Sequence, residues 1–262
     1  MEEITIATWN VNSIRSRKEL ALSWVKENKP DILLLQELKC VNEQFPREDF
    51  EDLGYNLALH GQKTFNGVAI LSLFPIDEVI TDFTDNPIPE QARYIEAVIS
   101  INKSAIRVVS VYVPNGETPD SDKYQNKLKF FDALETHLEE LLKLDEVIVI
   151  GGDFNVAPEE IDTYSPDNTS DTVLFCLEMR KKLRSLINLG LYDAFRLIHP
   201  KEQQFSWWDY RAGAWHKNHG LRIDHLLLSP EAADKLVAAE IDSSVRGKES
   251  PSDHAPVICR LA

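Results

Sequence analysis

The 262-residue chain is long enough for one large domain or two small ones, and its composition, 43% hydrophobic and 27% charged, is ordinary for a soluble globular protein. No apolar run approaches the roughly 18 residues that a membrane span needs, and the acidic, strand-like beginning is typical of neither a signal nor a transit peptide. With 28 basic and 43 acidic residues the net charge is −15, which disfavours a general nucleic-acid binder, because phosphate affinity comes mainly from cationic contacts.

The net charge lowers the expectation of a nucleic-acid substrate without excluding it. It does not describe how charge is distributed, and a divalent cation held by carboxylates reverses the local sign. The three cysteines, Cys40, Cys176 and Cys259, are far apart and form no C-x-x-C pair. This spacing argues against a disulfide framework or a thiolate zinc site. A protein without disulfides is typical of the reducing cytosol. We therefore expect a cytoplasmic protein.

The hydrophobic pattern predicts many strands and few long helices. Segments rich in β-branched and aromatic residues predict strands at 4–11, 31–37, 55–60, 67–73, 94–101, 106–113, 146–152, 205–210, 222–228, 239–245 and 255–261. Helical periodicity covers about 17–28, 123–143 and 174–189, and Pro230 suits the first turn of a further helix. The Pro-, Asp- and Ser-rich stretch 157–172 is expected to be a long surface loop.

Helices alternate with strands early in the chain, whereas the middle has consecutive strands with hairpin-like connections. This mixture predicts an α/β protein with two packed, mixed β-sheets and helices outside them, not a single doubly wound sheet. No repeat, low-complexity tract or flexible linker interrupts the sequence, so we expect one domain over residues 1–262.

The segment VIVIGGDFNV, residues 147–156, ends a buried strand with a carboxylate and an amide, Asp153 and Asn155. In an extended chain, residues i and i+2 point to the same side, roughly 7 Å apart. Both side chains would then face one space at the end of the strand, where open α/β sheets bind their ligands. The alternative is a polar turn in which the glycines and the asparagine only shape the backbone.

The same pattern recurs at other predicted strand ends: Asn10 and Asn12 in ATWNVNSIR, Glu37 in LLLQELK, Asp224 in GLRIDHLLLS, and Asp253 with His254 in SPSDHAPV. Singly, each has a structural explanation: a turn for Asn10, a strand end for Glu37, a buried pair with Arg222 for Asp224, and a core histidine for His254.

Together these residues favour a metal site. Burying several carboxylates without a cation is costly. Oxygen ligands with one histidine and no cysteine pattern favour Mg²⁺ or Mn²⁺ over zinc. A histidine beside an aspartate could act as an acid or base, or polarise a phosphate oxygen. These are the parts needed for metal-assisted hydrolysis of a phosphoester.

Six segments in order, TWNVNSIR, LLLQELK, YVPNGE, IGGDFNVAP, GLRIDHLLLS and PSDHAPV, resemble the exonuclease III family, the bacterial branch of the endonuclease/exonuclease/phosphatase superfamily. The resemblance extends from about residue 4 to residue 260. It implies a four-layer αβ-sandwich that hydrolyses DNA phosphodiesters with Mg²⁺, for which Mn²⁺ substitutes. The implied partner is double-stranded DNA with abasic sites or 3′ ends, with no membrane and no obligate protein partner.

The resemblance also implies roles for the polar residues. Glu37 would be the principal metal ligand, with Asn10 and Asp253 in or near the same shell. Asp153 would orient and deprotonate the attacking water while Asn155 holds the phosphate. His254 would hydrogen-bond a phosphoryl oxygen, with Asp224 fixing its tautomer. Tyr112 would contact the phosphate or the leaving oxygen; its structural alternative is a strand residue packed on the core.

Substrate-binding residues implied in the same way are Asn12, Arg93, Asn115, Trp207, Trp208, Arg211, Leu221 and Ile223. Trp207 and its neighbours would form a pocket for an abasic sugar or a terminal nucleotide, although Trp208 or Tyr210 could equally be core residues. Arg93 would contact a phosphate or else be a solvated strand residue. Residues 165–182 lack the S/T-F-x-P-E-E-R signature of many members, which leaves the balance of endonuclease and exonuclease action open.

The resemblance predicts a DNA repair nuclease that cuts 5′ of abasic sites and removes nucleotides or blocking groups from 3′ ends. One alternative is a superfamily phosphatase or phosphodiesterase acting on a lipid, inositol phosphate or nucleotide, which the acidic composition favours mildly. Another is a non-catalytic binding module, which the intact set of polar residues opposes.

Overall fold

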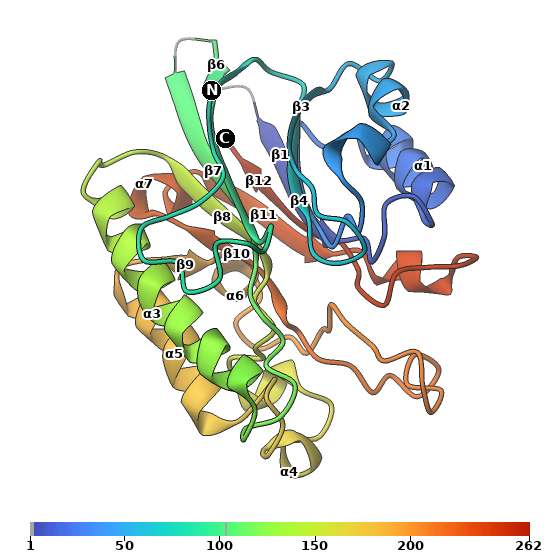
Figure 1. Ribbon diagram of the computed structural model, residues 1–262, viewed down its shortest axis with the longest axis vertical. Helices are drawn as coiled ribbons and strands as arrows, with labels where there is room; N and C mark the ends of the chain where they lie inside the picture. The colour runs from blue at the N-terminus through green and yellow to red at the C-terminus, as the bar shows by residue number, and fades with distance from the viewer. Residues whose placement is uncertain (1–2, 103) are drawn as a thin grey trace.

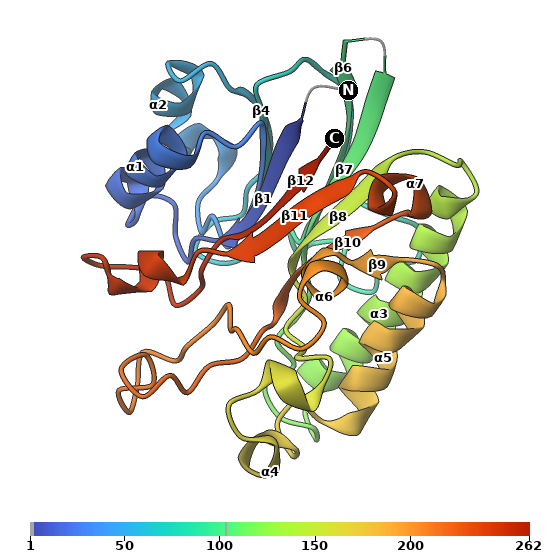
Figure 2. The ribbon, with the colours of Figure 1, turned by 180° about the vertical axis from the view of Figure 1, so that it is seen from behind.

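The computed structural model describes residues 3–102 and 104–262, which form two six-stranded sheets packed face to face (Figures 1 and 2). The first sheet has the order β11 (Leu236–Ile241), β12 (Val257–Leu261), β1 (Ile4–Asn10), β2 (Ile32–Gln36), β4 (Val68–Ser72) and β3 (Asn56–His60). The second has the order β5 (Ile76–Ile80), β6 (Tyr94–Ile101), β7 (Ser104–Tyr112), β8 (Ile148–Asp153), β10 (Asp224–Leu228) and β9 (Tyr192–Asp193). Each sheet is mixed, because β1 and β2, and β7 and β8, run parallel while the other pairs are antiparallel.

Helices cover the outer face of each sheet. In Figure 1, α1 (Lys18–Asn28) and α2 (Arg47–Glu51) lie on one side, and α3 (Asp122–Leu142) and α5 (Leu177–Asn188) lie side by side on the other. The four-layer αβ-sandwich is therefore confirmed. The remaining helical turns are η1 (Asn42–Gln44), η2 (Glu160–Asp162), α4 (Pro166–Thr169), α6 (Ala194–Ile198), α7 (Pro230–Ala233) and η3 (Ser243–Gly247). None of the helices in the described ranges combines the length and apolar character that a membrane crossing requires.

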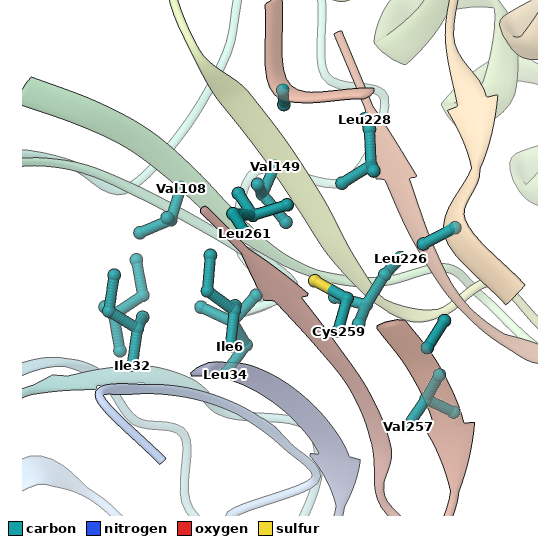
Figure 3. Close-up of a cluster of buried hydrophobic side chains, with 14 of the residues drawn as sticks. Ile6, Ile32, Leu34, Val108, Val149, Leu226, Leu228, Val257, Cys259 and Leu261 are labelled. Atoms are coloured by element: carbon teal, nitrogen blue, oxygen red, sulfur yellow. The ribbon is translucent and has the colours of Figure 1, made fainter. Parts of the chain in front are cut away.

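The sheets are held together by aliphatic side chains that alternate along each strand. Ile6 and Leu34 of the first sheet point toward Val149 and Leu226 of the second, and all are buried (Figure 3). Leu33, next to Leu34, points the other way, into the layer between the first sheet and α1. Burial of one such side chain stabilises the fold by roughly 1.5–3 kcal/mol. Burial on both faces explains the continuous aliphatic runs in these strands.

The glycine pair in β8 is required by this packing. A Cβ on Gly152 would lie 1.9 Å from the carbonyl oxygen of Val111, and one on Gly151 would lie 2.6 Å from Cδ1 of Leu34 in the opposite sheet. Only glycine allows β8 to approach both neighbours this closely just before Asp153. The close approach brings the ends of the two sheets together.

Several predicted elements need correction. Residues 205–210 are not a strand, since Trp207 forms only isolated bridges with Leu221 and His254. The predicted strand 239–245 is β11 at Leu236–Ile241 followed by η3, and the loop 157–172 contains η2 and α4. The short strand β9 and the edge strand β5 were not predicted; the three middle residues of β5, two acids and a valine, are all exposed. The helices 18–28, 122–142 and 177–188 confirm the predicted ranges to within three residues.

Candidate active site

The polar residues at the strand ends meet at one edge of the sandwich. β1, β2, β7 and β8 end there, and β10 begins there because it is antiparallel to β8. The register places Asp153 of β8 between Tyr112 of β7 and Asp224 of β10. His254 lies just before β12, which is antiparallel to β1. Residues far apart in the sequence therefore share one site.

Asn10 links carboxylates from the two sheets. Its Nδ2 donates to Oε1 of Glu37 at 2.8 Å and to Oδ2 of Asp153 at 3.0 Å. Its own Oδ1 accepts the backbone N–H of Asn12 at 3.0 Å. In this orientation Asn10 presents its nitrogen, and not its oxygen, to the acids, so it fixes the distance between the two carboxylates.

Glu37 has an uncommon backbone conformation, and its side chain lies beside a positive charge. Its φ of 54° is uncommon for a residue with a side chain, and such strain concentrates at functional sites. Oε2 pairs with Nζ of Lys39 at 2.8 Å, and the same ammonium donates to Oδ1 of Asn12. Burial opposes ionisation, but the charge of Lys39 and the hydrogen bond from Asn10 outweigh it and lower the pKa of Glu37. Glu37 is therefore a carboxylate at neutral pH.

His254 and Asp224 form a buried pair. Nδ1 of His254 lies 2.9 and 3.1 Å from the two carboxylate oxygens of Asp224. The Ser206 hydroxyl donates to Oδ2 of Asp224 at 2.6 Å and accepts the backbone N–H of Asp224 at 3.0 Å. Burial alone would lower the pKa of His254, but the carboxylates of Asp224 and Asp153 raise it to about 10. The imidazole is therefore a cation at neutral pH.

Asp153 faces the other side of this imidazole, with 3.7 Å between its Oδ2 and Nε2 of His254. Burial and the nearby charges of Asp224 and Glu37 raise the pKa of Asp153 to about 7, against the lowering effect of His254. One ligand atom each from Glu37, Asp153 and His254 lies within 4.8 Å of the others. Two carboxylates at this spacing suit a hard divalent cation, and several neighbouring acids give the negative charge that such an ion offsets.

A second group of polar residues flanks Asp153. Asn155 has a left-handed backbone (φ 52°), and its backbone N–H donates to Oδ1 of Asp153 at 2.9 Å. Nδ2 of Asn115 donates to Oδ1 of Asn155 at 3.1 Å, so the two amides form a pair. The Arg93 guanidinium stacks 4.5 Å above the ring of Tyr112. Arg93, Tyr112 and Asn115 line an open cavity of about 600 Å³.

Asp253 lies beside the group formed by Glu37, Asp153 and His254 and is not part of it. Its Oδ2 accepts the indole N–H of Trp207 at 3.0 Å, and its Oδ1 accepts Nδ2 of Asn12 at 2.8 Å. Burial opposes ionisation of this carboxyl, but the charge of His254 and the two hydrogen bonds lower its pKa. Asp253 therefore links Trp207 to the end of β1.

Comparison with known proteins shows the family of the chain. The model of the endonuclease/exonuclease/phosphatase family matches residues 7–254. The chain belongs to this family. It is 34% identical to exodeoxyribonuclease III from Haemophilus influenzae, over 95% of this chain and 97% of that protein.

Solved structures of family members are also similar. An AP endonuclease from Archaeoglobus fulgidus superposes with a TM-score of 0.93 at 40% identity, covering 98% of both chains. A 3′ phosphatase from Neisseria bound to a product DNA hairpin superposes with a TM-score of 0.94 at 36% identity, covering 99% of both chains. The resemblance to the exonuclease III family, and with it a hydrolytic nuclease, is confirmed.

Three residues that were expected to line the substrate pocket are instead buried in the protein. Trp208 is 2% exposed, and its indole N–H donates to Asn218, so it is a core residue and does not line a pocket. Leu221 and Ile223 are also buried, in a small cluster against which Trp207 packs. They lie beneath Trp207 and offer almost no surface to a ligand. The Arg211 side chain, by contrast, is 90% exposed, in the segment that projects from the body before β10 (Figures 1 and 2).

The alternative pairing of Asp224 with Arg222 is wrong. The buried Arg222 guanidinium bonds instead to Asp162 and Asp193, both at 2.7 Å. Lys39 and Ser206 contact the candidate acids directly, although no role was expected for either residue. Lys39 lies within the LLLQELK segment and could have been considered there. Nothing in the sequence around Ser206 indicates that its hydroxyl contacts Asp224.

Proposed function

We propose that the protein is a metal-dependent DNA repair nuclease that hydrolyses phosphodiesters 5′ of abasic sites and removes nucleotides or blocking groups from 3′ ends. The observation that carries the proposal is the alignment of Asp224, His254 and Asp153, in which an imidazolium held by one carboxylate faces a second carboxylate. This alignment suits attack of water on a phosphoryl group next to a fixed positive charge.

Asp153 would orient the attacking water and accept its proton. A pKa near neutrality suits a general base, because the group is both ionised and basic at working pH. His254 would donate from Nε2 to a phosphoryl oxygen, while Asp224 keeps Nδ1 as a donor and stabilises the charge. Asn155 and Asn115 would hold the phosphate beside Asp153, and Tyr112 would contact the phosphate or the leaving oxygen.

Glu37 would be the principal metal ligand, since it is ionised and its carboxylate lies at the junction of the sheets. Asn10 and Asp253 would act close to the ion, the first by fixing the carboxylates and the second through Asn12. A bound Mg²⁺ would supply positive charge to the phosphate oxygens, and Mn²⁺ would substitute, as oxygen-rich sites accept both ions. In this account, Lys39 stabilises the charge of Glu37.

Double-stranded DNA is the substrate that the surface around the site supports best, despite the net charge of −15. Four cations and two acids line a groove beside the site: Arg15, Arg17, Lys18 and Lys248 with Glu19 and Glu249, which leaves an excess of positive charge. Arg17 also donates to the hydroxyl of Tyr210 and the carbonyl of Asn12. Cations grouped in this way can bind backbone phosphates whatever the charge of the rest of the surface. The named activities of the relatives, on abasic sites and on 3′ ends, support both parts of the proposal.

Trp207, with Leu221 and Ile223 beneath it, would contact an extruded sugar or a terminal nucleotide. Arg93 and Arg211 would contact phosphates, and Asn12 would act on substrate next to Asp253. We also propose that residues 1–262 form one domain that acts in the cytoplasm, which the three free cysteines support.

The test uses three duplexes, carrying an abasic site, a 3′-phosphate or a recessed 3′ end. Each is incubated with the protein in Mg²⁺ and, separately, in excess chelator. The proposal predicts cleavage 5′ of the abasic site and processing of at least one 3′ end, with both lost in chelator. Absence of any reaction with the three duplexes in Mg²⁺ would contradict it.

A further inference from the structure

Lys127, on the second turn of α3, has a completely buried side chain that contacts three loops at once. Its Nζ donates to the carbonyl oxygens of Asn115 at 3.0 Å, Asn155 at 2.7 Å and Val173 at 2.9 Å. An ammonium has three N–H donors, so each donor has one carbonyl partner. Lys127 therefore joins the segment after β7, the segment after β8 and the segment before α5.

Two of these carbonyls belong to the amide residues beside Asp153. Asn115 and Asn155 are bonded to each other through their side chains, and Lys127 holds the backbone of both. Gly116 follows Asn115 with a φ of 95°, and a Cβ there would lie 3.0 Å from Cδ of Lys127. The turn after Asn115 is therefore shaped around the lysine stem.

The charge of Lys127 is costly in this position. The partners of its Nζ among the described residues are neutral carbonyl oxygens and not carboxylates. Burial lowers the pKa of Lys127 to about 7, against the opposing charge of Asp153. A leucine or methionine would fill the same space without a desolvation cost, but it would leave three buried carbonyls without donors.

We propose that Lys127 is a positioning residue for hydrolysis, which sets the places of the Asn115 and Asn155 amides by binding the carbonyl of each. The inference rests on the proposed function, in which these amides hold the reacting phosphate. It assigns Lys127 no contact with substrate. Replacement of Lys127 should slow the chemical step, because small displacements of a positioned group lower rates much more than they lower overall DNA binding.

The variant is Lys127→Met, which keeps the length of the stem and removes all three donors. The matched control is Leu134→Ala, two turns further along α3, where a buried side chain packs in the apolar cluster under this helix but has no polar atom that could bind the three carbonyls. Both changes should lower the melting temperature.

The single-turnover rate constant on an abasic duplex should fall about 100-fold for Lys127→Met and stay within about threefold for Leu134→Ala. DNA affinity in chelator should change less than about threefold in both. If Lys127→Met does not fold, Lys127→Gln, which keeps two donors on a shorter stem, is used in its place.

A double-mutant cycle with Asn155→Ala separates positioning from general support. If Lys127 acts through the amide pair, its replacement in the Asn155→Ala background should cost about tenfold or less. An equal loss in both backgrounds, or a kcat for Lys127→Met that matches Leu134→Ala, would overturn the inference while the proposed function stands. A wild-type protein that fails to cut the abasic duplex would overturn the proposed function, and this inference with it.

Discussion

Nδ1 of His254 lies 2.9 Å from Oδ2 of Asp224, and both side chains are almost completely buried. Asp224 is itself fixed by the Ser206 hydroxyl and stands opposite Asp153 in the register of β8 and β10. Because a charged imidazole is buried only where a carboxylate offsets its desolvation, the pair defines both the protonation state and the direction of His254. Its free nitrogen faces Asp153.

Replacing either member of this pair tests the division of roles. His254→Asn should lower the single-turnover rate constant by about 100- to 1000-fold, because a preorganised donor aimed at phosphoryl charge contributes roughly 3–4 kcal/mol. Asp224→Asn should lower kcat less, since the imidazole remains as a donor, although it loses both its orienting carboxylate and the charge that does most to raise its pKa. A larger loss for Asp224→Asn than for His254→Asn would reverse the assigned roles.

Asp153→Asn tests proton transfer. The amide has nearly the same size as the carboxylate but cannot accept a proton from water. We expect kcat to fall as far as in His254→Asn, with DNA binding in chelator retained. The measurement is single-turnover cleavage of an abasic duplex, alongside thermal melting to show that the fold survives. Near-normal turnover would remove Asp153 from the proton-transfer role.

Much of this site could be predicted from the sequence because its acids and amides follow or precede aliphatic strands. Asp153 and Glu37 stand out there as polar residues at the end of buried runs. The four-layer fold could be predicted for the same reason and from the ordered family segments. Contacts that depend on tertiary packing could not be predicted, such as the hydrogen bond of Ser206 to Asp224, and the sequence could not decide between a pocket and a core position for Trp208. The edge strand β5 lacks a buried face in its middle residues, so its pattern gave no signal.

Trp207→Ala separates a substrate-contacting role from a core role. Its indole binds Asp253 and packs on Leu221 and Ile223 while remaining partly exposed. We expect loss of activity on abasic duplex, equivalent to roughly 1–3 kcal/mol, with little change on a small aryl phosphodiester. Trp207→Phe keeps the apolar contact and should lose much less. A core role would instead lower stability by roughly 3–5 kcal/mol and reduce both activities equally.

The buried Asp162–Arg222 pair should make stability depend on pH. Burial opposes ionisation of Asp162, but the Arg222 and Arg196 guanidinium groups outweigh it and lower its pKa. A carboxyl whose pKa is lower in the folded state stabilises the protein above its unfolded pKa of roughly 4, and this contribution is lost as pH falls through the folded value.

Asp162→Asn should therefore lower the free energy of unfolding by about 3 kcal/mol at pH 7, and the difference from wild type should shrink below about pH 4. Glu51→Gln is the control, because its pair with Arg47 on α2 is half exposed at both side chains and should contribute about 1 kcal/mol or less. Urea unfolding at both pH values measures the difference. If the difference in unfolding free energy between wild type and Asp162→Asn stays constant or widens in acid, the ionised pair is not the cause of that difference.

The central claim is that a divalent cation held at Glu37 drives hydrolysis at this edge of the sheets. The most direct measurement is the rate of abasic-duplex cleavage as Mg²⁺ is titrated into wild type and Glu37→Ala, with melting curves of both. The account predicts no wild-type cleavage in excess chelator, recovery with Mg²⁺ or Mn²⁺, and a Glu37→Ala protein that stays folded but needs at least about tenfold more Mg²⁺ for half-maximal rate. Full wild-type activity in chelator, or the same Mg²⁺ requirement in Glu37→Ala, would contradict it.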